Sequence, residues 1–142
     1  SMNEKPFERL VTNASAAREA SGDFLLRSLE MRLDNIVRRM GIATSIKTAR
    51  QLVLHGHIKV NGRFVNIPSF AVKTDDMISL SPKLKENVGV KLSMDTAKRL
   101  NQRPTFGEFN EADLTFKIVR LPERAEMSFP VNEQLIIEYY SK

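Results

Sequence analysis

Few side chains in this sequence could perform catalysis or hold a metal ion. The two histidines, His55 and His57, flank Gly56, and this stretch supplies no third ligand of the kind a zinc site requires. They are better suited to donate to a phosphate or to cap a turn. Asp75 and Asp76 are adjacent carboxylates, but adjacent residues of a strand point to opposite faces, so we interpret them as a solvated turn. We expect no metal, no cofactor and no catalytic pair at these positions.

The motifs of common enzyme classes are also missing. The sequence contains no Gly-rich phosphate loop ending in Lys-Ser or Lys-Thr, no Gly-x-Ser-x-Gly elbow and no cysteine. Arg32-Leu33-Asp34 is similar to the signature around the catalytic aspartate of pseudouridine synthases, where that aspartate lies in a separate and larger domain rich in β structure. Here Asp34 falls within a predicted helix and can pair with Arg38, four residues further on. We therefore predict a structural aspartate and a protein that is not an enzyme.

Positive charge is concentrated in one part of the chain. The 142 residues have a net charge of +5, but residues 32–73 contain eight basic residues and a single acidic one, Asp34. The positive charges of this segment repel one another unless a negatively charged group such as phosphate approaches them. This favours a nucleic-acid partner over a merely solvated face. No apolar run reaches the ~20 residues of a membrane span, and no signal-peptide core opens the sequence, so we expect a cytoplasmic protein.

Two helices are predicted to position the basic side chains. The first ends near Gly41 and begins after a cap at Ser21-Gly22-Asp23, and its apolar residues recur at helical spacing: Leu26, Leu29, Leu33, Ile36, Val37 and Met40. The second begins at Thr44 or Ser45 and runs to about Leu54. Its apolar arc consists of Ala49, Leu52 and Val53. The opposite side of this second helix presents Lys47, Arg50, Gln51 and His55.

A hairpin follows this helix pair. Asn61-Gly62 tolerates the positive φ angles of a type I′ turn, and pairing across it places Ile58, Val60 and Val65 on one face and Lys59 with Phe64 on the other. A third strand is predicted at residues 77–80. Further elements are a weak helix within 83–103, using Val88, Leu92, Ala97 and Leu100, a short strand at 116–121, a weak helix at 3–20 and a helix at 132–140.

These residues carry a family resemblance. The stretches Leu29–Asn35, Ala49–Val53, Gly56–Gly62 and Val65–Ser69 resemble the S-four family of bacterial small-subunit ribosomal proteins. The ending, Leu121–Arg124 and Asn132–Lys142, resembles the C-terminal tail of the same family. S-four domains also occur in RNA enzymes, whereas this tail is typical of the ribosomal family.

The resemblance implies an α+β fold with an inserted domain. A small helix-pair-plus-sheet S-four (alpha-L) RNA-binding domain would occupy residues 32–127, with its motif core at 31–81 and an extension at 82–127. It would interrupt a helical subdomain formed by residues 3–31 and 128–142. Family members begin with a further basic arm, so the resemblance implies a truncated or shortened member. Thr44 and Ile46 stand where the family tends to place arginines, and Phe106 stands near a usual tryptophan.

By resemblance, the protein is a structural constituent of the small ribosomal subunit. It would bind a multi-helix junction of ribosomal RNA, nucleate assembly of the subunit body and contribute to translational accuracy. The expected partners are small-subunit ribosomal RNA and neighbouring ribosomal proteins including S-five, with no membrane, and the protein would be a monomer outside the ribosome. The protein would recognise the shape of the RNA more than its sequence, by contacting phosphates and 2′-hydroxyls. The residues expected to make these contacts are Arg32, Arg39, Lys47, Arg50, Gln51, His55, Lys59, Asn61 and Arg63.

Three alternatives remain open. The chain could be a stand-alone S-four-domain RNA-binding factor acting on ribosomal particles, against which the tail argues. It could be the RNA-binding fragment of an RNA-modifying enzyme, which would need a catalytic domain that these 142 residues do not supply. It could also be a protein-interaction module whose basic face meets an acidic partner.

Overall fold

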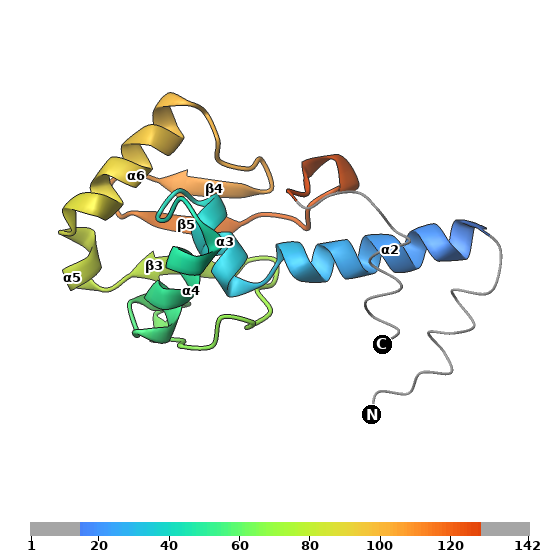
Figure 1. Cartoon of the computed structure of the whole chain (residues 1–142), viewed down its shortest axis with the longest axis horizontal. Helices are drawn as coiled ribbons and strands as arrows, with labels where there is room; N and C mark the ends of the chain where they lie inside the picture. Colours follow the sequence, from blue (N-terminus) through green and yellow to red (C-terminus); the bar gives the residue numbers. More distant parts are fainter. Residues whose placement is uncertain (1–14, 129–142) are drawn as a thin grey trace. The chain divides into compact units, whose positions relative to one another are not determined.

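The computed structural model describes residues 15–128, with side chains from residue 21 onward. The described residues form two compact units, one of residues 31–122 and one of the flanking segments 15–30 and 123–128 (Figure 1). The helix predicted at 132–140, and most of the one predicted at 3–20, lie outside the described residues. Within residues 15–128, no helix has the length and apolar character needed to cross a membrane.

The larger unit is built on a five-stranded antiparallel sheet. Its strands are β1 (Ile58–Val60), β2 (Arg63–Phe64), β3 (Met77–Leu80), β4 (Gly107–Asn110) and β5 (Thr115–Ile118), in the order β2-β1-β3-β5-β4. Figure 1 shows β5 between β3 and β4. The predicted α+β class is confirmed, as are the hairpin strands and β3. The strand predicted at 116–121 is present as β5, and β4 was not predicted.

The turn between β1 and β2 has the predicted backbone conformation and strand pairing. Asn61 and Gly62 have φ angles of 52° and 81°, and Lys59 pairs with Phe64 across the turn. The Asn61 side chain then joins the turn to β3, because its Oδ1 accepts from Met77 N at 2.9 Å and its Nδ2 donates to Asp76 Oδ1 at 2.9 Å. The turn predicted before β3 is also present.

The predicted boundaries of the first helix are wrong. Two helices occupy this region, α2 (Ser15–Glu30) and α3 (Leu33–Arg39), so the chain is helical through the supposed cap at 21–23 and leaves the helix at Met31 and Arg32. The cause is a segment distant in sequence. Val72 N donates to Met31 O at 2.8 Å, Leu33 N to Phe70 O at 2.9 Å and Asp34 N to Pro68 O at 3.0 Å.

In the smaller unit, α2 packs against a short 3₁₀ helix, η1 (Arg124–Glu126). Asp23, assigned to a cap from the sequence, instead forms an ion pair with Arg124 at 3.1 Å. The buried Glu30 carboxylate accepts hydrogen bonds from Ser128 N at 2.8 Å and Ser128 Oγ at 2.9 Å. Asp23 therefore lies inside a helix and contacts the segment that follows residue 122, rather than capping a helix start.

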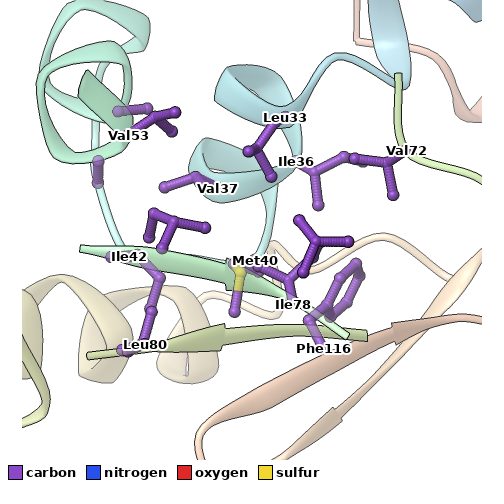
Figure 2. Packing of buried hydrophobic residues seen from close by; sticks show 14 of the residues in the cluster. Leu33, Ile36, Val37, Met40, Ile42, Val53, Val72, Ile78, Leu80 and Phe116 are labelled. Carbon is purple, nitrogen blue, oxygen red and sulfur yellow. The ribbon is translucent and has the colours of Figure 1, made fainter. Parts of the chain in front are cut away.

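The second helix of the predicted pair is confirmed as α4 (Ile46–Leu54). Ser45 caps it, its Oγ accepting from Thr48 N at 3.1 Å, and Gly56 follows the helix end with a φ of 76°. Figure 2 shows side chains of α3 and α4 meeting those of the sheet. The contributing residues include Leu33, Ile36 and Val37 from α3, Val53 from α4, and Ile78, Leu80 and Phe116 from the strands.

The weak helix predicted within 83–103 forms as two helices, α5 (Pro82–Lys85) and α6 (Val88–Arg99). Of the four apolar residues named in this segment, only Ala97 is buried. Val88, Leu92 and Leu100 are exposed, and the core positions are taken by Val90 and Met94. Asn87 sets the helix start by accepting from Val90 N at 3.0 Å.

Arg103 ties α6 to the end of α3. Its Nε donates to Met40 O at 2.7 Å and its Nη2 to Met94 O at 3.3 Å, while its guanidinium lies 3.7 Å from the Phe109 ring centroid. Burial lowers the pKa of Arg103, and the nearby Glu111 carboxylate opposes that shift. An arginine keeps its charge in either case, so a permanent cation holds these carbonyls together.

The approach of α3 to α6 depends on Gly41. Its φ is 98°, and a Cβ at this position would lie 2.6 Å from Ala97 Cβ. Gly56 has a similar φ of 76° but open space around it. Gly41→Ala should therefore lose about 1–3 kcal/mol more unfolding free energy than Gly56→Ala, because only Gly41 adds overpacking to backbone strain. Urea denaturation of the two variants measures the difference, and equal losses would contradict the close approach.

Candidate nucleic-acid interface

A buried carboxylate organises the cations of the helix pair. Asp34, at the start of α3, accepts from Arg32 Nε at 3.2 Å and Arg32 Nη2 at 3.1 Å, and from Asn35 N at 2.7 Å. Arg50 of α4 places its Nη1 3.9 Å from Asp34 Oδ2. Arg38, the partner predicted from the sequence, donates instead to Asn35 Oδ1 at 2.7 Å. Asp34 thus brings together two of the predicted binding residues from different helices.

This arrangement leaves donors available at the surface. The Arg50 side chain is 52% exposed and that of Arg32 is 31% exposed, while the shared carboxylate is buried beneath them. Two guanidinium groups on one carboxylate leave a local excess of positive charge. Because a guanidinium has five N–H donors in a planar fork, both arginines can hold Asp34 and still donate to a phosphate.

The exposed side of α4 extends the same surface. Lys47, Gln51 and His55 are all exposed, whereas Ala49 and Val53 are buried, so the predicted division of this helix into basic and apolar sides is confirmed. Thr44 and Ile46 are exposed at the start of the helix. The two positions where the family tends to place arginines therefore present uncharged groups to solvent.

Arg39 and Asn61 have structural contacts of their own. The Arg39 guanidinium lies 5.7 Å from the ring centroid of the buried Phe106, which precedes β4. The Asn61 amide is engaged with Asp76 and Met77, as described above. Among the histidines, His57 Nδ1 lies 3.2 Å from Ser81 Oγ, joining the start of β1 to the residue after β3. In residues 15–128, no three potential ligands gather into a metal site.

The hairpin residues divide between the two faces of the sheet. Val60, opposite Arg63, is buried on the face that the helices cover, so Arg63 lies on that side at the edge strand. Lys59 and Phe64 form the next pair and point to the other face. Among the predicted cations, Arg32 and Arg50 therefore meet at Asp34 and Lys47 lies on the exposed side of α4, whereas Lys59 lies on the opposite face of the sheet.

Comparison with known proteins gives consistent matches. The S4 domain family model matches residues 31–78. Small ribosomal subunit protein uS4 of Acidobacterium capsulatum is 46% identical over 139 residues, which are 98% of this chain and 66% of that protein. The protein of the same name from Shewanella loihica is 43% identical, with 98% and 67% covered. That from Brevibacillus brevis is 43% identical, with 99% and 69% covered. The chain spans about two thirds of the length of these relatives.

Proposed function

Because this chain belongs to the family of small ribosomal subunit protein uS4, we propose that it acts as a structural, RNA-binding constituent of the small ribosomal subunit. Membership of the family confirms the resemblance found in the sequence and the prediction that the protein is not an enzyme. The site of action we propose is the ribosome in the bacterial cytoplasm.

The observation that supports RNA binding most directly is the convergence of Arg32 and Arg50 on Asp34, within a segment, residues 32–73, that has eight basic residues and a single acidic one. A planar guanidinium can donate two parallel hydrogen bonds to two oxygens of one phosphate. Two guanidinium groups held at a fixed spacing therefore suit an RNA backbone. Lys47, Gln51, His55 and Arg63 extend the contacts to neighbouring phosphates and 2′-hydroxyls. Arg39, which lies over the Phe106 ring, and Asn61, which holds the hairpin turn, are the further contacts in this proposal.

The RNA target in this proposal is a junction of several helices. Side chains cannot read the deep, narrow major groove of A-form RNA, so a surface of guanidinium and ammonium groups recognises the placement of backbones. A junction brings several backbones together and so offers phosphates at many positions. Binding would fix the junction during assembly of the subunit body, and contact with S-five would influence decoding accuracy. The protein would be a monomer before it is incorporated.

Co-purification tests the proposal in cells. A tagged chain should be recovered with small-subunit ribosomal RNA and small-subunit particles. Recovery of the chain without RNA, or with intermediates of the large subunit alone, would contradict it and favour a stand-alone factor.

Salt dependence tests the electrostatic part of the proposal. Each phosphate neutralised releases counterions, so the logarithm of the affinity should fall by about 0.7–0.9 per log unit of salt for each phosphate contacted. With several basic residues engaged, the total slope should be several times that of a single contact. The measurement is a filter-binding titration with a small-subunit RNA fragment over a range of monovalent salt. An affinity that stays flat over this range rules out phosphate contacts as the main source of binding.

A further inference from the structure

We propose that Phe64 and Lys59 form a stacking site for one unpaired RNA base on the face of the sheet opposite the helices. This inference rests on the proposed RNA-binding function and adds a ligand to it: a single-stranded nucleotide, held apart from the phosphate contacts around Asp34. The base would lie against the Phe64 ring, and the Lys59 ammonium would meet the phosphate of the same nucleotide.

Strand register places the two residues on this face. Lys59 pairs with Phe64 on β2 and with Ser79 on β3, so the three side chains form a row across three strands. Their neighbours along β1, Ile58 and Val60, are buried on the face packed against the helices. Since successive side chains of a strand alternate between faces, the row of Phe64, Lys59 and Ser79 lies opposite the helix pair.

The Phe64 ring is exposed to solvent, although it lies within a sheet. It is 57% exposed, whereas Phe116, which lies on β5 and points to the helix side of the same sheet, is completely buried. A ring that filled a gap against a loop would have lost most of its surface to that loop. The exposed ring offers a flat π face of the kind on which bases stack in proteins that bind single strands.

Lys59 completes the chemistry of the site. Its Nζ lies 4.9 Å from the centroid of the Phe64 ring, so the ammonium is held beside the aromatic surface by a cation–π contact. Its cross-strand neighbours are Phe64 and Ser79, which are both uncharged, and its charge is therefore available to a phosphate. Lys117, in comparison, has Met77 and Glu108 as cross-strand neighbours, so a carboxylate rather than an aromatic ring lies next to it on the same face.

The ligand must be unpaired, because the bases of a duplex are already stacked on each other and show only their edges. Stacking tolerates any base, so the site should prefer single-stranded RNA without preferring a sequence. This preference separates it from the surface around Asp34, which contacts backbone phosphates.

The experiment compares two RNA probes with the full chain. One is a short duplex with a single-stranded overhang that contains 2-aminopurine, and the other is the same duplex with blunt ends. The wild-type chain should bind the overhang probe about tenfold more tightly, and binding should quench the 2-aminopurine fluorescence. Phe64→Leu should abolish both the preference and the quenching while leaving affinity for the blunt duplex unchanged. Phe64→Tyr should retain both, because it keeps the aromatic ring.

The outcomes separate this inference from the proposed function. Equal affinity of the wild-type chain for the two probes, or a Phe64→Leu variant that keeps the preference and the quenching, overturns the stacking site alone. Failure to bind either probe, with salt-sensitive binding of the small-subunit RNA fragment retained, also overturns the stacking site alone. Salt-insensitive binding of that fragment, or no binding to it, overturns the proposed function and the stacking site together. Thermal unfolding of Phe64→Leu and Phe64→Tyr should match that of the wild type, since the residue is exposed.

Discussion

Replacing Arg50 with alanine will weaken binding to small-subunit ribosomal RNA by roughly tenfold to a hundredfold. The side chain is half exposed, and it reaches the buried Asp34 carboxylate from the opposite helix to Arg32. A charged hydrogen bond contributes about 1.5–3 kcal/mol, and each 1.4 kcal/mol corresponds to about a tenfold change in affinity. A filter-binding assay at fixed salt measures the loss.

Lys117→Ala is the matched control for this variant. Lys117 is also an exposed cation, but it lies on β5 opposite Glu108, on the face of the sheet away from the helix pair. Its removal should change the affinity little. The Arg50→Ala chain should remain folded, because its 3.9 Å ion pair is partly exposed and such pairs stabilise proteins weakly. Equal losses in the two variants would show that binding depends on total charge and would remove the special role of the site around Asp34.

Replacing Phe116 with alanine will lower the unfolding free energy by about 3–5 kcal/mol. The ring is fully buried between the sheet and the helices, and it lies so close to β4 that a Cβ at Gly107 would be 2.3 Å from its Cζ. Removing it would leave a cavity in the center of the core. Urea denaturation followed by circular dichroism measures the loss, and Phe116→Leu, which keeps part of the volume, should lose less.

The control for this variant is Phe64→Ala, which makes the same substitution on the other face of the same sheet. Phe64 is mostly exposed, so its removal should cost far less than that of Phe116. If the two substitutions destabilised the chain equally, Phe64 would be a core residue, and its proposed role in stacking would fail as well.

Elements whose causes are local could be predicted from the sequence. The Asn61-Gly62 turn depends on two residues that accept positive φ angles, and the start of α4 depends on a serine three residues before the amide it caps. The break between α2 and α3 could not be predicted in this way. It depends on hydrogen bonds between residues 31–34 and residues 68–72, which lie almost forty positions further along the chain.

The candidate site shows the same division. The basic side of α4 follows from helical periodicity within nine residues, and it was predicted correctly. The pairing of Asp34 with Arg50 was not predicted, because Arg50 reaches Asp34 only after the two helices pack together. The close approach of Ala97 on α6 to Gly41 after α3 is likewise a contact between segments far apart in sequence. Local patterns therefore identified the cations, and packing determined which of them meet.

The position of Asp34 also has a kinetic consequence. Because this carboxylate already fixes the Arg32 side chain, the ordering that usually costs about 0.5–1.5 kcal/mol per immobilised side chain on association takes place during folding. The same negative charge weakens the long-range field that draws a polyanion toward the surface. We therefore expect a lower association rate constant and a longer residence time than for the same surface without this carboxylate.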